Sequence, residues 1–169
     1  MSNFKLSVTG HRPHKLWGYD YSEPHYAILT SKFEDIVRDI LTKYDSITMY
    51  SGMAIGTDIV FALTAIKLKG LGLPVKLCCV IPFEGQSSQW PAQTQDLYNY
   101  VVSVADEVVY TAGPGYAHWK MQRRNEYLVD VCNKLVAVWD GVEDGGTFNC
   151  IEYAVSKNCD WIHINPKDL

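Results

Sequence analysis

Ser51-Gly52-Met53-Ala54-Ile55-Gly56-Thr57-Asp58 is the stretch that decides the fold. It follows a short apolar segment, residues 47–50, and precedes an apolar run, residues 59–68, with the character of a helix. Glycine lets the backbone approach a ligand closely, and the first N–H groups of a helix have no partner inside the helix. A strand that ends in such a turn and feeds a helix is therefore a candidate site for a phosphate or carboxylate.

A second junction of this kind lies near the C-terminus. Residues 135–139 form an apolar run typical of a buried strand, and Asp140-Gly141-Val142-Glu143-Asp144-Gly145-Gly146-Thr147 follows it. Glycine pairs are ordinary turn residues, so neither junction identifies a ligand by itself. Two of them in one chain of 169 residues indicate a nucleotide-like ligand.

Strands and helices are predicted to alternate along the whole chain, which we expect to form one domain over residues 1–169. Apolar runs predict strands, and apolar positions three and four residues apart predict helices. The expected strands are residues 4–9, 46–51, 75–81, 107–110, 135–139 and 161–164. The expected helices are residues 25–44, 57–69, 92–104, 118–133 and 147–157. This order predicts an α/β, Rossmann-like three-layer sandwich with a mostly parallel central sheet and helices on both faces.

Polar loops follow the predicted strands. In parallel sheets, ligands bind beyond the C-terminal ends of the strands, where neighbouring connections diverge. Four loops are therefore expected to meet at one edge of the sheet, with residues 111–118 as a possible fifth. The four are residues 10–18, 51–58, 82–90 and 140–147.

Composition narrows the classes of function. The formal net charge is −4, which argues against sequence-independent binding of nucleic acid through many Lys and Arg. No run approaches 18 consecutive apolar residues, and the N-terminus has no signal-peptide layout. Five cysteines form no Cys-x-x-Cys pair, and the five histidines are scattered, so we expect reduced thiols, no metal site and a cytoplasmic protein.

The ordered motifs resemble the SLOG superfamily, Rossmann-like proteins that include the DprA/Smf proteins and the lonely-guy phosphoribohydrolases, and they are most similar to its YpsA-like branch. The resemblance spans nearly the whole chain. It depends on Thr9-Gly10-His11-Arg12-Pro13-His14, Ser51-Gly52-x-Ala54-x-Gly56-x-Asp58, Ile81-Pro82-Phe83 with Trp90, Met121-x-x-Arg124-Asn125, and Gly145-Gly146-Thr147. It implies a nucleotide or nucleotide-derived ligand and no required cofactor.

The candidate ligand-binding residues combine these motifs with the expected loops. They are Gly10, His11, Arg12, Ser51, Gly52, Gly56, Thr57, Asp58, Pro82, Phe83, Trp90, Arg124, Asn125, Asp140, Gly145, Gly146 and Thr147. Simpler roles remain open for several of them. Thr57, Asp58 and Thr147 are also expected helix caps, and Arg124 also fits a solvated basic face with Lys120 and Arg123. Rim aromatics such as Phe83 and Trp90 either stack on a base or pack their loops on the core.

Two classes of function follow. The first is a protein that binds a nucleotide as a sensor or sequestering module, and the alternative is a hydrolase of a nucleotide N-glycosidic bond. Similarity to the lonely-guy enzymes implies Gly-Gly-x-Gly-Thr-x-x-Glu, but here the inner glycine is missing and Glu152 lies five residues after Thr147. Two extra residues rotate a helical position by about 200°, so Glu152 is expected to point away from the cleft. Asp140 and Glu152 are the catalytic candidates, and Glu143 could also supply a carboxylate.

Single-stranded DNA binding of the DprA/Smf kind is a third possibility, which the acidic net charge disfavours. Relatives of this kind often pair through surface helices, so a homo-oligomer is also expected. The expected partners are thus a small-molecule nucleotide and a second copy of the chain, with neither nucleic acid nor a membrane.

Overall fold

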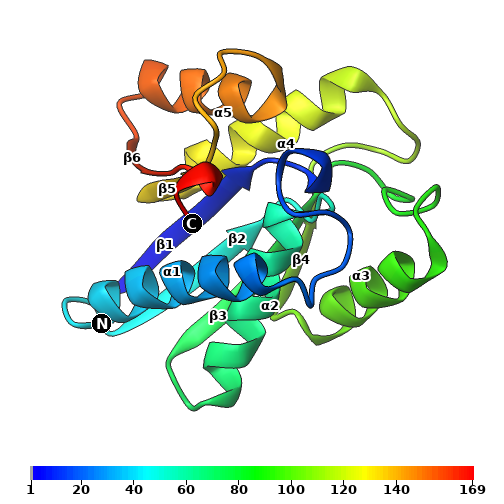
Figure 1. Cartoon of the computed structure of the whole chain (residues 1–169). Helices are drawn as coiled ribbons and strands as arrows, with labels where there is room; N and C mark the ends of the chain where they lie inside the picture. Colours follow the sequence, from blue (N-terminus) through cyan, green and yellow to red (C-terminus); the bar gives the residue numbers. More distant parts are fainter. Residues whose placement is uncertain (1) are drawn as a thin grey trace.

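The computed structural model describes residues 2–169 and contains one six-stranded sheet in the order β4-β3-β2-β1-β5-β6 (Figure 1). Every pair of neighbouring strands is parallel. The strands are β1 (Asn3–Gly10), β2 (Ser46–Ser51), β3 (Val75–Ile81), β4 (Glu107–Tyr110), β5 (Lys134–Val138) and β6 (Asp160–Ile164). The chain builds outward from β1 to β4 and then returns to the other side of β1 with β5. The connections therefore diverge between β1 and β5.

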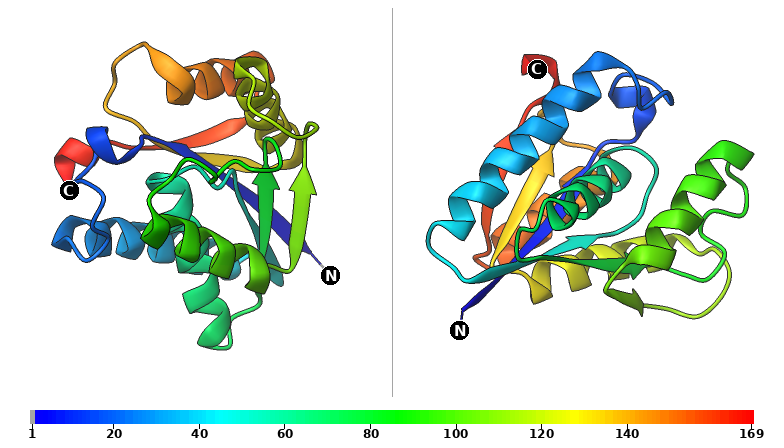
Figure 2. Two further views of the ribbon diagram at one scale, coloured as in Figure 1. Left: turned by 90° about the vertical axis from the view of Figure 1, so that its right-hand side faces the viewer. Right: turned by 90° about the horizontal axis from the view of Figure 1, so that it is seen from below.

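Helices cover both faces of the sheet (Figure 2). One layer contains α1 (Pro24–Leu41), α2 (Thr57–Gly70) and α3 (Ala92–Val104), and the other contains α4 (His118–Val131) and α5 (Gly145–Ser156). Two short 3-10 turns, η1 (Pro13–Lys15) and η2 (Pro166–Asp168), complete the elements. The predicted three-layer α/β class is confirmed, and the sheet is parallel throughout.

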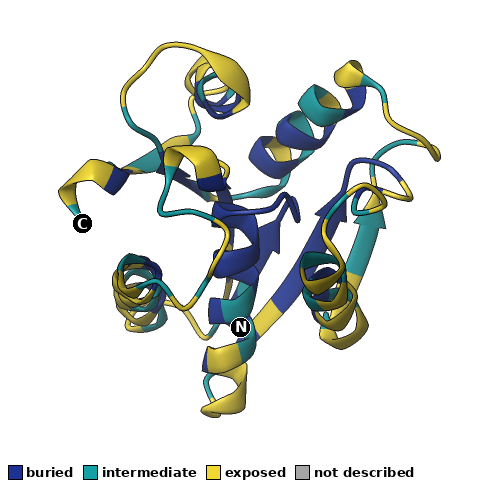
Figure 3. Ribbon diagram, turned by 45° about the vertical axis from the view of Figure 1, so that its right-hand side comes forward, coloured by how far each residue is buried: buried dark blue, intermediate teal, exposed yellow. Residues whose placement is uncertain are grey.

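The main core lies between the sheet and the α1–α2 layer. Buried strand side chains such as Leu6 and Met49 pack against α2, and the rings of Phe33 on α1 and Phe61 on α2 meet edge to face with centroids 5.1 Å apart. Figure 3 shows the inner strands and the inner helix faces as buried, and the exposed residues on the outer helix faces and loops. Inner strands such as β3 and β5 are buried on both sides and therefore lack alternating polarity, whereas the edge strands β4 and β6 are more exposed.

Three helix boundaries differ from the sequence prediction by two or more residues, and one of them is the end of α4, which lies at Val131 and not at residue 133. α1 ends at Leu41, three residues before the predicted end, and the chain turns at Thr42, whose amide and hydroxyl both donate to the Asp39 carbonyl (3.1 and 2.6 Å). α5 begins at Gly145, two residues before Thr147, after the extended residue Asp144. Thr147 is therefore inside the first turn and is not the N-cap that the sequence indicated.

The five cysteines are free thiols, with Cys78, Cys79 and Cys150 buried. None of the helices in the described part of the chain combines the length and apolar character that crossing a membrane requires.

Candidate functional site

A two-lobed cleft opens at the C-terminal edge of the sheet, beside the divergence between β1 and β5. All five loops that the sequence predicted to converge contribute residues to it. One lobe has a volume of about 360 Å³ and the other about 460 Å³. The lobes share four lining residues: Arg12, Ala54, Tyr116 and Met121. The shared residues make the two lobes parts of one cleft.

The smaller lobe, called here the charged lobe, is lined by most of the ionisable side chains of the cleft. Its cationic side chains are Arg12, Lys15 and Arg124, its imidazoles are His11, His14 and His118, and its acidic residues are Asp58 and Asp144. Its walls come from the loop after β1, the start of α2, α4 and the first turn of α5. Such an excess of basic groups favours an anionic ligand.

The larger lobe, called here the aromatic lobe, lies between the loop after β3 and the loop that precedes α4. Its lining includes Phe83, Trp90 and Tyr116, with Glu84 and Gln89 as exposed polar residues. Gln86 also lines it, but its amide is already engaged, because it donates to the Gly52 carbonyl (3.2 Å) and accepts from Tyr98 (3.1 Å). Apolar rings with a few polar groups are the usual lining of an organic ligand site.

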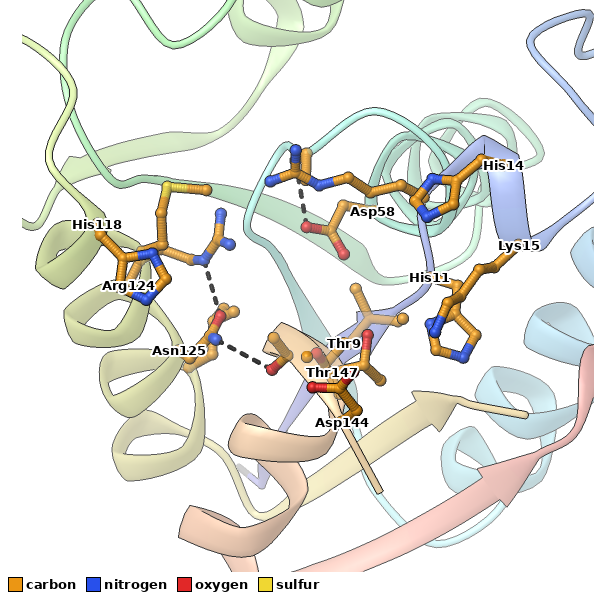
Figure 4. A pocket seen from close by; sticks show the side chains of 18 of the residues that line it. Thr9, His11, His14, Lys15, Asp58, His118, Arg124, Asn125, Asp144 and Thr147 are labelled. Carbon is orange, nitrogen blue, oxygen red and sulfur yellow. Dashed lines mark hydrogen bonds between the residues drawn. The ribbon is translucent and has the colours of Figure 1, made fainter. Parts of the chain in front are cut away.

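Arg124 is the central cation of the charged lobe. It is only 6% exposed, yet it lines the cleft. Its Nη1 donates to the Gly52 carbonyl (2.6 Å) and its Nε to Asn125 Oδ1 (3.1 Å), and Asn125 Nδ2 donates to the Gly146 carbonyl (3.4 Å). Figure 4 shows this chain of contacts linking α4 to the first turn of α5. The solvated basic face considered from the sequence is wrong for Arg124 and for Lys120, since both are buried.

Asp58 is the acidic counterpart of Arg124. It is 6% exposed, lines the charged lobe, and its Oδ2 accepts from the Ala54 amide (3.1 Å). Burial raises the pKa of this carboxyl, and the nearby Arg124 guanidinium opposes that effect. The Asp58 carboxylate accepts from an amide of the loop that precedes α2, and the N-cap of α2 is Gly56. Asp58 is therefore not the helix cap that the sequence suggested.

The glycine-rich turn after β2 is bonded mainly to its own surroundings. The amide and hydroxyl of Thr57 both donate to the His11 carbonyl (3.2 and 2.9 Å), and the Gly56 amide donates to the Tyr21 hydroxyl (2.9 Å). Gly56, rather than Thr57, is the N-cap of α2. This turn therefore shapes the wall of the cleft and contributes Ala54 and Asp58 to its lining.

The start of α5 has a different arrangement. Asp144, its N-cap residue, makes no side-chain capping hydrogen bond, and Asp144, Gly145 and Gly146 are exposed and line the charged lobe. Gly145 has a φ of +88°, a conformation that favours glycine. An uncapped helix start that borders several cations favours an anion.

His11 joins the loops after β1 and β5. Its Nε2 lies 3.0 Å from Asp140 Oδ1 and also 3.0 Å from the Asp140 amide. The same nitrogen makes both contacts, so it accepts from the amide when neutral and donates to the carboxylate when protonated. Burial lowers the pKa of His11, and the hydrogen bond and charge of Asp140 partly offset this effect. Asp140 thus helps to hold the two loops together.

The buried imidazole predicts a pH-dependent stability. With a folded-state pKa below 6.5, His11 binds fewer protons in the folded than in the unfolded protein, so the free energy of unfolding should fall as pH drops below about 6.5. Urea unfolding of the wild type and His11→Gln at pH 7.5, 6.5 and 5.5 measures this. We expect the wild type to lose more stability than the variant across that range. Equal losses would contradict the prediction.

The structure brings together most, but not all, of the predicted site residues. The predicted residues that line the cleft are Gly10, His11, Arg12, Asp58, Phe83, Trp90, Arg124, Asn125, Gly145, Gly146 and Thr147. The predicted residues that do not line it are Ser51, Gly52, Gly56, Thr57, Pro82 and Asp140. Glu152 is exposed on α5 and does not line the cleft either, as its position in the helix predicted.

Several lining residues were missing from the sequence prediction. His118 lies one turn before Met121 on the stripe of α4 that continues to Asn125, so extending that stripe would have found it. Lys15 comes from the short turn η1, and Tyr116 and Asp144 come from loops, where the sequence has no periodicity to assign a direction to a side chain. No group of three or more His, Cys, Asp or Glu side chains within residues 2–169 is arranged to hold a metal ion.

Comparison with known proteins identifies the family. The model of the YspA SLOG family matches residues 6–166. The chain belongs to the YspA SLOG family. A family relative, the uncharacterised SPbeta prophage-derived protein YoqJ of Bacillus subtilis, is 32% identical over 137 residues, which are 75% of this chain and 80% of YoqJ. A UPF0398 protein of Brevibacillus brevis is 27% identical over 172 residues, covering 98% and 90% of the two chains. The SLOG resemblance inferred from the motifs is confirmed.

Solved structures support the same fold for this family member. DNA processing protein A of Streptococcus pneumoniae superposes with a TM-score of 0.67 at 17% identity, over 97% of this chain and 53% of that one. The DNA processing protein A of Helicobacter pylori, whose structure concerns single-stranded DNA binding, gives a TM-score of 0.65 at 11% identity. The match covers 97% of this chain and 66% of the Helicobacter pylori chain. The chain spans about half and two thirds of the lengths of these two proteins, and at such identities the likeness shows the fold alone.

Proposed function

We propose that the protein binds a nucleotide or nucleotide-derived ligand in the two-lobed cleft. The observation that carries this proposal is the joining of two chemically different lobes at Arg12, one rich in cations and one rich in aromatic rings. A nucleotide has the same division, with an anionic phosphate at one end and a flat, stackable base at the other. A ligand-binding role, as a sensor or in sequestration, needs no further chemistry.

The charged lobe has the groups that a phosphate requires. The guanidinium of Arg124 is held in place by Gly52 and Asn125, so it loses little freedom on binding an anion. The exposed start of α5 faces the same lobe. Hydrogen bonds to charged groups of this kind contribute about 1.5–3 kcal/mol each.

Hydrolysis of an N-glycosidic bond is the second candidate function. The carboxylate candidates from the sequence are poorly placed for it, because Asp140 is paired with His11 and Glu152 is exposed outside the cleft. Asp58 is the buried carboxyl that lines the charged lobe and is the better candidate for stabilising a positively charged sugar. The absence of a second such carboxylate among the buried lining residues favours binding over catalysis.

Single-stranded DNA binding stays a third candidate because the structural neighbour from Helicobacter pylori binds it. The net charge of −4 offers little attraction to a polyanion outside the cleft.

Isothermal titration calorimetry with AMP, ADP, ADP-ribose, cyclic AMP, a dinucleotide and oligo-dT tests the proposal. We expect at least one of the small nucleotides to bind with a Kd below about 1 mM, which corresponds to about −4 kcal/mol. Chromatography of the incubated mixture separates binding from hydrolysis, because only hydrolysis releases free base. The proposal would be overturned if the folded protein bound none of these compounds, or if it bound only oligo-dT.

A further inference from the structure

Lys120 is a buried cation outside the cleft lining. It is 9% exposed, and its Nζ donates to three successive backbone carbonyls, those of Gly113 (2.9 Å), Pro114 (3.0 Å) and Gly115 (2.7 Å). Within residues 2–169, no carboxylate pairs with this ammonium. Burying an ammonium is costly unless its donors are satisfied, and here a loop satisfies all three. The contacts of Lys120 therefore fix the shape of the loop before α4.

The residue that this loop presents is Tyr116. It is 69% exposed, although it follows directly after a segment fixed by a buried side chain. It lines both lobes of the cleft, and its ring meets the ring of Phe83 edge to face, with centroids 5.8 Å apart. The Gly115 amide also donates to the Glu84 carbonyl (3.4 Å), which ties this loop to the loop after β3. Tyr116 is thus an exposed aromatic ring on a well-anchored backbone.

We propose that the aromatic lobe is the base subsite and that Tyr116 is the residue on which the base stacks; this proposal rests on the proposed function. Lys120 is then the positioning residue that holds Tyr116 in place. The ligand is then a nucleotide whose base is covered by Tyr116 and whose phosphate lies in the charged lobe. An exposed tyrosine gains favourable contact area when a base covers its face. A loop already fixed by Lys120 loses little entropy in that step.

The other two aromatic residues of this lobe are less accessible for stacking on a base. Phe83 is 7% exposed and packed beneath the loop, and Trp90 is engaged edge to face with Tyr98, with centroids 5.2 Å apart. Both rings therefore form the floor and wall of the lobe. Tyr116 is the exposed ring among the three aromatic residues that line it.

Calorimetry with AMP and with ribose 5-phosphate tests this proposal, because the two ligands share the phosphate and sugar but only AMP has a base. Tyr116→Ala is expected to weaken AMP binding about 10-fold and to leave ribose 5-phosphate unchanged. Tyr116→Phe keeps the ring and should bind AMP like the wild type. Tyr100→Ala is the matched control, since Tyr100 is a tyrosine on α3 that is 50% exposed and lines neither lobe.

Lys120→Met tests the positioning role. It should weaken AMP binding and spare ribose 5-phosphate, and combining it with Tyr116→Ala should cause no further loss, because Lys120 acts through Tyr116. Equal loss for both ligands would show a general structural defect and overturn the role of Lys120. AMP binding no tighter than ribose 5-phosphate, or unaffected by Tyr116→Ala, would overturn the base subsite. Failure of every nucleotide in the screen would overturn the proposed function itself.

Discussion

Arg124→Ala is expected to weaken AMP binding by about 100-fold, the upper end of what a hydrogen-bonded charge contributes. The guanidinium lines the charged lobe, is nearly buried, and is oriented by the Gly52 carbonyl and by Asn125. Removing it leaves the lobe without its central cation. It also leaves the Asp58 carboxylate without the positive charge that offsets the effect of burial on its pKa. Calorimetry with AMP and with ribose 5-phosphate measures the loss, which should be the same for both ligands.

Two variants on the same helix control this experiment. Arg123→Ala removes an exposed neighbouring charge and should leave affinity within about 2-fold, because surface charges contribute little. Arg124→Lys keeps the positive charge but not the planar fork, so an intermediate affinity is expected. Urea unfolding shows whether each variant is folded. A folded Arg124→Ala protein with wild-type affinity would place the phosphate elsewhere.

Gly56→Ala should lower the free energy of unfolding by about 3 kcal/mol, the sum of a strained backbone and an overpacked site. Gly56 has a φ of +105°, where side chains are disfavoured. A Cβ there would lie 2.8 Å from the His11 carbonyl oxygen and 3.0 Å from the Arg12 Cα, and the former is rigid backbone that accepts two hydrogen bonds from Thr57. Urea unfolding monitored by circular dichroism measures the loss.

Gly72→Ala separates the two contributions. Gly72 also has a positive φ, +88°, but a Cβ there meets nothing within 4 Å. It should therefore show only the conformational penalty, about 1 kcal/mol. If Gly56→Ala lowers the free energy of unfolding no more than Gly72→Ala does, the close approach of Gly56 to the loop after β1 does not limit stability.

The sequence predicted the fold well because its elements are locally encoded. The run Val75–Ile81 is apolar enough to indicate a strand covered on both faces, and α1 has one clear apolar stripe through Phe33, Val37 and Ile40. The errors are at element ends. α1 ends in a turn at Thr42, and α5 begins at Gly145, which has a positive φ, and neither feature belongs to a periodic pattern in the sequence.

The site was predicted less completely, because the sequence shows which residues adjoin a rim but not which way they face. Thr57 and Gly56 adjoin the cleft, yet their amides are used by His11 and Tyr21. These partners are 46 and 35 residues away in the chain, so no local pattern reveals them. Lys120 and Tyr116 matter through a loop whose shape depends on three hydrogen bonds from the Lys120 side chain to carbonyls five to seven residues earlier, and residue type alone does not reveal such contacts.

One carbonyl oxygen connects the two halves of the cleft. The Gly52 carbonyl accepts from Arg124, which lines the charged lobe (2.6 Å), and from Gln86, which lines the aromatic lobe (3.2 Å). A ligand that draws the guanidinium toward itself is expected to weaken the first of these bonds, which would free the carbonyl for a shorter bond to Gln86 and so change the wall of the aromatic lobe. Affinities of fragments that fill each half separately should therefore not sum to the affinity of the intact molecule.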